Sequence, residues 1–431
     1  MIDLCKNGNF TNIGSLLDAM AKAMNLIDPD VTDHHQQTAY LSHLIAKEAG
    51  FDENLTELTV YSALLHDVGA VLLEFRTFRE GDRMYERVVA KLGAGLLRGL
   101  PYYYEIAEVV DSCQLSWDEI KELLEKDHTK NPEFLRVSAV ISLADFISSE
   151  INGSQGAVLD RASQICETVK KGRGTEFSEE SADAFLRISE LEYVWFDTVY
   201  NPSFRTDFAG HSRGVSLENA LDLTQLMTRL IDYRSSFTAM HSAGVAASAM
   251  KLAELCGMTK QECLMMRIAG NLHDIGKLKV PREILEKPGR LNDHEFNVIK
   301  EHPYYTRLIL DGIDGFEKIT EWASFHHEKL NGKGYPFHIG KSDIDTGARI
   351  VAVADIFSAI TEVRPYRAGM PKERAMKVLR ENAARGDICP EIVNLLFENY
   401  EEVDFTRDRV SRAAGKRYFE SLDGSVNGAT A

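Results

Sequence analysis

The stretch Asn271-Leu272-His273-Asp274-Ile275-Gly276-Lys277 places a histidine beside an aspartate, followed by a glycine and a lysine. Taken alone, such a His-Asp pair is more often a helix cap or a surface pair than a functional site. Here it is followed by three more histidines and another aspartate, at His302, His326, His327 and Asp355. Imidazole and carboxylate groups are the usual ligands of iron, manganese and zinc. The gathering therefore indicates a metal site suited to phosphate chemistry.

The same pattern occurs earlier in the chain. A histidine, a glycine and a His-Asp pair follow one another at equal steps in both halves, as His34, Gly50 and His66-Asp67, and as His241, Gly257 and His273-Asp274. The offset is 207 residues (273 − 66), and Gly69 corresponds to Gly276. Farther on, Leu143-Ala144-Asp145 resembles Val353-Ala354-Asp355. These matches predict two copies of one structural unit.

Apolar residues recur at three- and four-residue steps in most of the chain, as in 41–49, 245–255 and 375–381. This is the period of an amphipathic helix, and alternating β-branched residues are rare. We therefore expect an all-α fold with two tandem helical domains. Breaks between helices are expected at Gly50, Gly93, Gly257, Gly289 and 332–336.

The chain of 431 residues is long enough for two or three domains. We expect the first copy at 1–200, a linker and connecting helix at 201–234, the second copy at 235–405 and a tail at 406–431. Residues 201–212 are the predicted linker. The helix from 216 to 234 is predicted to connect the domains or to pack against one of them. The small polar residues 424–431 are predicted to be disordered.

The formal net charge of −17 argues against broad electrostatic binding to DNA or RNA. It does not exclude a small phosphorylated substrate, because bound divalent metals can dominate the local field. The six cysteines are scattered without a C-x-x-C pair and are predicted to be reduced thiols. The sequence shows neither a signal peptide nor an apolar stretch long enough for a membrane span. These features predict a cytoplasmic protein.

The two copies differ in how many metal ligands they supply. The second copy has seven candidates, which are enough for two metals: His241, His273, Asp274, His302, His326, His327 and Asp355. The first copy has four, which are enough for one metal: His34, His66, Asp67 and Asp145. Two metals held close together can clamp a phosphoryl group during in-line attack. The second copy is therefore predicted to be the catalytic one.

At this point a family resemblance becomes visible. The His-Asp pattern is similar to that of the HD superfamily of metal-dependent phosphohydrolases, and the second copy resembles its HD-GYP branch. The matching segments are HDIGKLKVPREILEKPGRLN at 273–292, EHP at 301–303, HHEKLNGKGYP at 326–336 and ADIFSAITEVRPYR at 354–367. Members of this branch are bacterial phosphodiesterases that degrade cyclic dinucleotides, chiefly cyclic di-GMP. The resemblance implies such a substrate and two divalent metals, iron or manganese, as cofactors.

The resemblance also implies a role for each ligand. Asp274 bridges the two metals, and His241 completes a set of terminal ligands formed by His273, His302, His326, His327 and Asp355.

Further residues are implied to act on the substrate. Lys277 follows His273 by about one helical turn, so it would face the same site and neutralise charge on a phosphate oxygen. Arg364 and Arg367 match positions that grip substrate phosphates, for which the planar guanidinium is suited. Tyr335, in the Gly-Tyr-Pro turn, is expected to contact the substrate.

Three positions depart from the family pattern. Asn331 and Ser358 stand where the family commonly has aspartate, which leaves the loop geometry and the substrate preference open. Phe237 stands where some members carry a glutamate that holds a third metal. The sequence therefore predicts two metals in this copy rather than three.

The first copy has two interpretations. It has Ala70 at the position of Lys277 and no equivalent of the Gly-Tyr-Pro turn. We favour a vestigial domain used for regulation or for forming a homodimer. The alternative is a domain that binds one metal and acts on a nucleotide.

The sequence thus predicts a metal-dependent phosphodiesterase that opens a cyclic dinucleotide to its linear form, and cyclic di-GMP is the substrate we favour. The mixed dinucleotide 3'3'-cyclic GMP-AMP is the alternative within this class, because tandem-HD relatives act on it. The second alternative is a module that senses a nucleotide or holds partners without turnover. The complete ligand set and Lys277 favour the enzyme.

Overall fold

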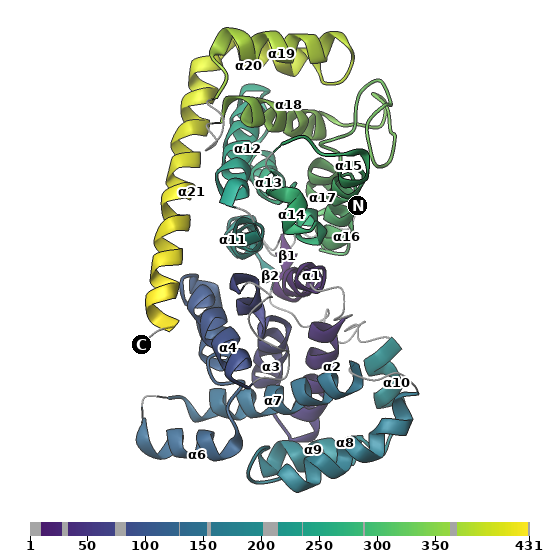
Figure 1. Cartoon of the computed structure of the whole chain (residues 1–431), viewed down its shortest axis with the longest axis vertical. Helices are drawn as coiled ribbons and strands as arrows, with labels where there is room; N and C mark the ends of the chain where they lie inside the picture. Colours follow the sequence, from purple (N-terminus) through teal and green to yellow (C-terminus); the bar gives the residue numbers. More distant parts are fainter. Residues whose placement is uncertain are drawn as a thin grey trace. The chain divides into compact units, whose positions relative to one another are not determined.

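The computed structural model describes residues 10–27, 33–73, 83–128, 130–152, 157–200, 214–234, 236–287, 289–362 and 369–429. Most of these residues are helical (Figure 1). The strands in these ranges are β1 (Thr11–Asn12) and β2 (Gly214–Val215), which pair antiparallel with Thr11 opposite Val215. The prediction of an all-α fold is confirmed.

The chain divides into two compact units, here called the N-terminal unit (Met20–Arg213) and the C-terminal unit (Met1–Ala19 with Gly214–Val426). These boundaries differ from the predicted ones mainly because β1 and the start of α1 (Ile13–Asn25) belong with the later residues. The β1–β2 pair and a hydrogen bond from Asn12 Nδ2 to Asp314 Oδ2 of 2.7 Å account for this grouping. The predicted linker at 201–212 lies outside the described residues.

The described part of the N-terminal unit is built from helices. After α1 these are α2 (His34–Glu48), α3 (Glu53–Leu65), the 3₁₀ helix η2 (Val68–Leu72), α4 (Arg83–Arg98), η3 (Pro101–Tyr103), α5 (Tyr104–Val110), α6 (Trp117–Lys126), α7 (Pro132–Asn152), α8 (Val158–Gly172), α9 (Glu179–Ile188) and α10 (Glu192–Tyr200).

The C-terminal unit contains a second series of helices. They are α11 (Leu217–Arg234), α12 (Ser236–Leu255), α13 (Lys260–Leu272), η4 (Ile275–Lys279), α14 (Arg282–Leu285), α15 (Asp293–Ile299), α16 (His302–Leu310), α17 (Glu317–Ser324), α18 (Thr346–Thr361), α19 (Lys372–Ala384), α20 (Pro390–Glu398) and α21 (Tyr400–Ala429).

The repeat seen in the sequence is a repeat of structure. In the C-terminal unit α12 packs against α13 and α18, and η4 packs on α16. In the N-terminal unit α2 packs in the same way against α3 and α7, and η2 packs on α4. The helices α2 and α12 are each followed closely by a glycine with positive φ, 79° at Gly50 and 77° at Gly257. The two units therefore share one helical arrangement.

The 3₁₀ helix that follows each His-Asp pair lies very close to the helix that it packs on, which is α16 for η4 and α4 for η2. A Cβ atom added to Gly276 would lie 2.0 Å from the carbonyl oxygen of His302, and one added to Gly69 would lie 2.1 Å from that of Val89. Only glycine permits these approaches. In the C-terminal unit the approach fixes η4, and with it Asp274, beside the first turn of α16.

Gly93 does not end a helix, contrary to the predicted break. It lies inside α4, where its Cβ position would be 3.1 Å from the backbone nitrogen of Gly69 and from the side chain of Val68. The glycine makes room for η2 to pack on α4, which outweighs its low helix propensity.

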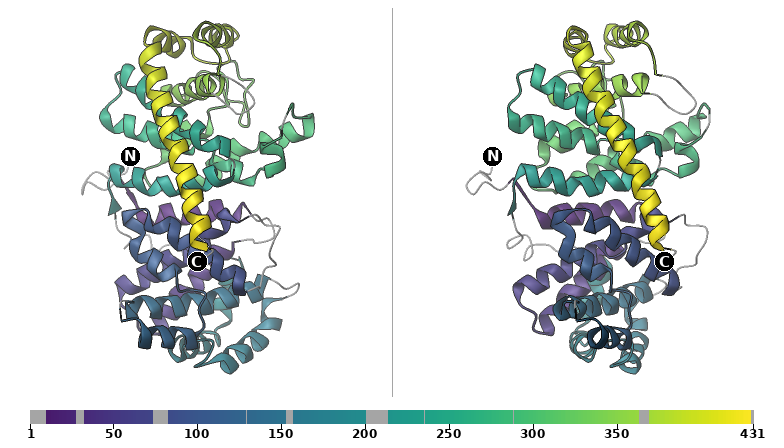
Figure 2. Two further views of the ribbon diagram at one scale, coloured as in Figure 1. Left: turned by 60° about the vertical axis from the view of Figure 1, so that its left-hand side comes forward. Right: turned by 90° about the vertical axis from the view of Figure 1, so that its left-hand side faces the viewer.

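The helix predicted at 216–234 is present, and the C-terminal tail is more helical than predicted. α11 buries apolar residues such as Leu223 and Leu226 and packs against α12 and α13, so it is a packing helix of the C-terminal unit. The predicted disorder at 424–431 is wrong for the described part, because α21 continues to Ala429 (Figure 2). α21 packs on α12 through Arg407 and Ser411, whose Oγ donates to the carbonyl oxygen of Met240 at 2.9 Å.

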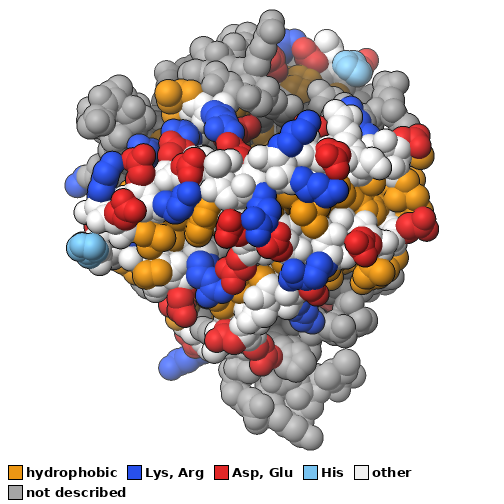
Figure 3. Space-filling model, turned by 90° about the horizontal axis from the view of Figure 1, so that it is seen from below, with side chains coloured by type: hydrophobic (Ala, Val, Ile, Leu, Met, Phe, Trp, Pro, Cys, Tyr) orange, Lys and Arg blue, Asp and Glu red, His pale blue; other side chains and the backbone are white. Residues whose placement is uncertain are grey.

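One face of the molecule is strongly charged but mixed in sign. On the face drawn in Figure 3, lysine and arginine side chains alternate with aspartate and glutamate rather than forming a broad basic field. Among the described helices, none combines the length and the apolar character that a membrane crossing requires.

We predict that Gly276→Ala destabilises the C-terminal unit by about 1–3 kcal/mol, because the added methyl group overpacks the η4–α16 contact. The same change at Gly340 is the matched control, since its Cβ position has only one neighbour within 4 Å, at 4.0 Å. Urea unfolding of the two variants measures the difference. Equal stabilities would show that the η4–α16 approach is not a tight constraint.

Candidate metal centre

The His-Asp pair lies where α13 ends. α13 begins at a capping box formed by Thr259 and Glu262, and His273 is the residue at its C-terminal cap. The Nδ1 atom of His273 lies 2.8 Å from the carbonyl oxygen of Gly270, three residues earlier. Because a carbonyl oxygen can only accept, Nδ1 carries the proton and Nε2 is left with its lone pair. The end of the helix thus presents Nε2 of His273 as a ligand.

Two further histidines are oriented by the same kind of hydrogen bond. Nδ1 of His302 donates to the carbonyl oxygen of Ile299 at 2.7 Å, and Nδ1 of His326 donates to that of Ala323 at 2.6 Å. Their Nε2 atoms are therefore both unprotonated, yet they lie only 3.2 Å apart. Two lone pairs facing each other at this distance repel, unless a cation lies near both.

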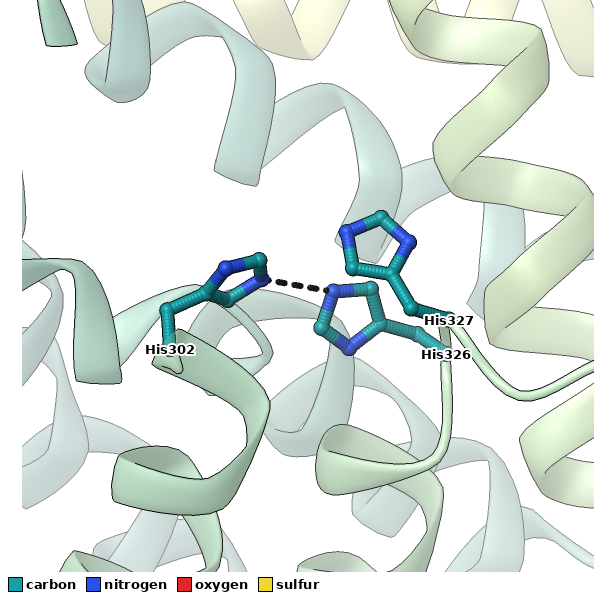
Figure 4. A group of neighbouring side chains, drawn as sticks. All are labelled: His302, His326 and His327. Carbon is teal, nitrogen blue, oxygen red and sulfur yellow. Dashed lines mark hydrogen bonds between the residues drawn. The ribbon is translucent and has the colours of Figure 1, made fainter. Parts of the chain in front are cut away.

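The candidate ligands form two groups of three. The first group is His241, His273 and Asp355, with 3.0 Å between His241 Nε2 and Asp355 Oδ1. The second is His302, His326 and His327, whose rings face one another in Figure 4. Within each group the ligand atoms lie within 4.8 Å of one another. That spacing suits three donors around one metal ion.

Asp274 lies between the two groups and is almost completely buried. Its Oδ2 is 3.4 Å from Nε2 of His273, and its Oδ1 is 3.4 Å from Nε2 of His302. The two carboxylate oxygens thus face different groups, as expected for a carboxylate that bridges two metals. The structure brings all seven predicted ligands together in this way.

The electrostatics also suit metal binding. Burial is the largest effect on four of the histidines and lowers the pKa of His273, His302 and His327, and that of His326 to about 4. Neutral imidazole is the form that binds metals. Burial raises the pKa of Asp274, but His273 and Lys277 outweigh it and hold the carboxyl well below its usual range. These four histidines therefore offer neutral nitrogen donors beside an ionised carboxylate.

Nitrogen and oxygen donors in two adjoining triads, joined by one carboxylate, fit two divalent ions of the iron, manganese or zinc type. The facing lone pairs of His302 and His326 support the same conclusion. The donor types do not select one of these metals.

Lys277 lies at the edge of this centre. Its ammonium group is 2.5 Å from Oδ2 of Asp274, and its side chain is partly exposed, so it borders both the buried carboxylate and the solvent side. Arg364 and Arg367, the predicted phosphate-binding residues, lie outside the described residues.

Tyr335 also borders the centre. Its ring lies 4.9 Å from the ring of His327 and 6.4 Å from that of Phe296, which is 44% exposed. The turn that carries Tyr335 is held by buried Glu328, whose Oε1 accepts from the backbone nitrogens of Phe337 and His338 at 2.6 and 3.2 Å. The glutamate that follows the two histidines thus positions the turn.

Asn331 has a clear structural role in place of the usual aspartate. Its Nδ2 donates to the carbonyl oxygen of Arg385 at 3.0 Å and to Oδ1 of Asp387 at 3.1 Å. Its Oδ1 accepts from the backbone nitrogen of Lys333 at 3.0 Å. An aspartate could not donate to Asp387, so the amide suits the carboxylate that it meets.

Sequence reasoning missed one residue of the centre, Glu362. The residue is buried, and its Oε2 lies 3.6 Å from Nδ1 of His241. Unlike Nδ1 of His273, His302 and His326, this Nδ1 atom does not donate to a backbone carbonyl oxygen. Burial lowers the pKa of His241, but Asp355 and Glu362 outweigh it and raise that pKa to about 9. Ser358, one turn earlier on α18, stands where family members carry aspartate. We infer that Glu362 orients His241 by charge attraction rather than by a hydrogen bond, because 3.6 Å is too long for one.

The N-terminal unit has a smaller cluster. His34, His66 and Asp145 form one group of potential ligands, and Asp67 Oδ2 lies 3.2 Å from Nε2 of His66. All four predicted residues are thus together. His35, which the sequence analysis overlooked, is buried beside them, with its ring centroid 5.6 Å from that of His66. The adjacent histidines at 34–35 were the available signal, since 326–327 show the same doublet.

Comparison with known proteins identifies relatives. Residues 225–392 match the family model of the HD domain. Over 408 residues the chain is 28% identical to 3'3'-cGAMP-specific phosphodiesterase 1 of Vibrio cholerae, covering 91% of this chain and 92% of that protein. Over 146 residues it is 38% identical to a cyclic di-GMP phosphodiesterase of Pseudomonas aeruginosa, covering 34% of this chain and 35% of that protein.

A solved structure has the same fold. It is the crystal structure of a cyclic GMP-AMP specific phosphodiesterase of V. cholerae, with a TM-score of 0.61 and 19% sequence identity. The match covers 91% of this chain and 98% of that one, so both units take part in it.

We predict that Glu362→Ala weakens metal binding at the centre by about 10- to 100-fold, as loss of a ligand-orienting partner does elsewhere. Ser358→Asp added to Glu362→Ala is expected to restore part of the affinity, because it returns a carboxylate to the same face of α18. Titration of the metal-free protein with Mn²⁺ measures both. Unchanged affinity in Glu362→Ala would refute the orienting role.

Proposed function

We propose that this chain is a metal-dependent phosphodiesterase of the HD-GYP type that hydrolyses a cyclic dinucleotide, because residues 225–392 match the HD domain and nearly the whole chain aligns with a phosphodiesterase of this substrate class. One observation carries the proposal: the two histidine groups of the C-terminal unit face opposite oxygens of one buried carboxylate, that of Asp274. A nucleotide-sensing module would need no such arrangement of reactive donors.

In this proposal the ligands of the two ions are the seven that converge: His241, His273, Asp274, His302, His326, His327 and Asp355. When bound, two divalent ions activate water and neutralise charge on a phosphoryl group. The chain's own contribution is to hold the donors rigidly. Hydrogen bonds at helix ends fix His273, His302 and His326 before any ion arrives, so little reorganisation accompanies binding.

Lys277 is proposed to stabilise the phosphate. Its ammonium group already lies next to Asp274, and its side chain reaches the solvent side from which a substrate must come. A positive charge at this place would offset negative charge that develops on a phosphate oxygen.

Tyr335 is proposed to contact the substrate beside His327, where its ring borders the second histidine group. Exposed Phe296 lies next to it and offers a further aromatic surface on which a base could stack. Arg364 and Arg367 stay predictions from the sequence.

For the substrate we propose 3'3'-cyclic GMP-AMP rather than cyclic di-GMP, which the sequence analysis favoured. The relative that aligns over nearly the whole of both chains is named for the mixed dinucleotide. The cyclic di-GMP phosphodiesterase of P. aeruginosa aligns over only 34% of this chain. Cyclic di-GMP stays the second candidate, because that shorter alignment has the higher identity. Chromatography of the products from each dinucleotide, at equal concentration, decides between them.

We predict that Asp274→Asn reduces hydrolysis of either dinucleotide to the background rate, because the amide keeps the shape of the side chain but not its bridging charge. The matched control is His294→Ala, an exposed histidine of the same unit. The rates are measured with metal-loaded protein. A wild-type protein that binds metal and dinucleotide yet leaves the dinucleotide intact would refute the proposed activity and favour the sensing module.

We predict that Lys277→Met lowers kcat by about 100-fold, while the metal content stays at the wild-type level, because Lys277 is not a ligand. Lys279→Met in the same 3₁₀ helix is the control and should keep wild-type kcat. Steady-state kinetics and elemental analysis of the same samples test this. A parallel loss of metal would mean that Lys277 acts by holding Asp274 rather than on the substrate.

A further inference from the structure

A buried threonine on α16 contacts the turn that carries the His-Asp pair of the C-terminal unit. Thr306 follows the candidate ligand His302 by one helical turn, and its side chain is completely buried. Its hydroxyl donates to the carbonyl oxygen of His273 at 2.9 Å and accepts from the backbone nitrogen of Gly276 at 3.1 Å. The single proton of the hydroxyl and one of its lone pairs are thus both used on the same short stretch of backbone.

That stretch of backbone holds the carboxylate that the two histidine groups share. Asp274 lies between α13 and η4 with φ −98° and ψ 7°, a sparsely populated conformation that is common in functional sites. Its side chain does not cap η4, so the carboxylate does not fix this conformation itself. Thr306 bonds to backbone groups on both sides of Asp274. It therefore restrains the backbone from which the carboxylate projects.

The same hydrogen bonds connect the two ligand groups to each other. His273 belongs to the first group, and His302, which lies on the helix of Thr306, belongs to the second. In two-metal sites the ions lie about 3.5–4 Å apart, so the distance between the groups must be held within narrow limits. Thr306 supplies a direct link from α16 to the backbone of the His-Asp pair.

The N-terminal unit has no hydroxyl at the equivalent place. The Cβ position of Gly276 lies 2.7 Å from the backbone nitrogen of Thr306, and that of Gly69 lies 2.5 Å from the backbone nitrogen of Gly93. Gly93 is therefore the equivalent of Thr306, at an offset of 213 residues (306 − 93). A Cβ atom on Gly93 would lie 3.1 Å from the backbone nitrogen of Gly69, and the corresponding nitrogen of Gly276 is the one that Thr306 binds.

The same offset identifies the counterparts of the second histidine group. It pairs three residues of the N-terminal unit with that group: Val89 with His302, Cys113 with His326 and Gln114 with His327. Sγ of Cys113 donates to the carbonyl oxygen of Val110, three residues earlier, as His326 Nδ1 does to that of Ala323. The unit without the second histidine group is thus also the unit without the threonine.

We propose that Thr306 is a positioning residue that sets the separation of the two ligand groups, so that two ions share Asp274. The proposal rests on the two-ion centre of the proposed function and does not depend on which dinucleotide is cleaved. Thr306 acts through the backbone of His273 and Gly276. Valine would keep the shape of its side chain but remove both hydrogen bonds, whereas serine would keep the hydroxyl.

The test is the EPR spectrum of the full chain loaded with Mn²⁺, which distinguishes a magnetically coupled pair of ions from isolated ions. Wild type and Thr306→Ser should show the coupled signal. Thr306→Val should lose most of the coupled signal per chain, and in a titration its second ion should bind about 10- to 100-fold more weakly. A Thr306→Val protein with the coupled signal and the affinity of wild type would overturn the proposal.

Thr320→Val is the matched control and should keep the coupled signal. Thr320 is a buried threonine of the same unit whose hydroxyl donates at 3.3 Å to the carbonyl oxygen of Leu310, which is not a candidate ligand. If Thr306→Val does not fold, Thr306→Ala takes its place, and equal coupled signals in Thr306→Ala and Thr306→Ser would overturn the role of the hydroxyl.

The same samples separate this proposal from the proposed function. A wild-type protein without a coupled pair would refute the two-ion centre and the role of Thr306 with it. A wild-type protein that has the coupled pair but cleaves neither dinucleotide would refute the proposed activity alone. Because the readout for Thr306 is the coupling between the ions, its comparison with the variants stays decisive in that case.

Discussion

A single type of hydrogen bond organises both halves of this protein. At the end of a helix, a histidine turns its Nδ1–H back to the carbonyl oxygen three residues earlier, as in His66, His273, His302 and His326. The helix end has carbonyl groups without partners in the helix, and the imidazole satisfies one of them. In return the ring is fixed with Nε2 outward. The same hydrogen bond therefore caps the helix end and orients the ligand.

The metal centre holds several imidazole rings and carboxylates close together in the interior of the C-terminal unit. Burial favours the neutral form of His302, His326 and His327, so these three rings add no positive charge that would repel an incoming ion. Asp274 stays ionised because His273 and Lys277 lie next to it. His241 differs, since it faces the carboxylates of Asp355 and Glu362. The two groups of ligands are thus electrostatically unequal, with the anionic side around His241 and the neutral side around His302.

Much of this could be read from the sequence, because the ligands recur at fixed spacing and the helical period is clear. Other features depend on contacts between distant segments. Glu362 meets His241 only because α18 packs on α12. After Tyr400 and Val403 the buried positions of α21 are taken by Arg407 and Ser411, so the apolar pattern stops before the helix does. The helical Gly93 is explained by the approach of Gly69. In each case a tertiary contact overrides the local signal.

The equivalence of Val89, Cys113 and Gln114 with His302, His326 and His327 has a consequence for protein engineering. The N-terminal unit carries a scaffold whose helix ends, glycine approach and bridging aspartate already match those of the C-terminal centre. Building a binuclear centre into a new protein usually demands that the backbone be redesigned around it. In this chain the template and the host are already joined. They differ at the centre by the second ligand group, by Lys277, by Thr306 in place of Gly93, and by the partner of the first histidine, which is Glu362 for His241 and Ser148 for His34.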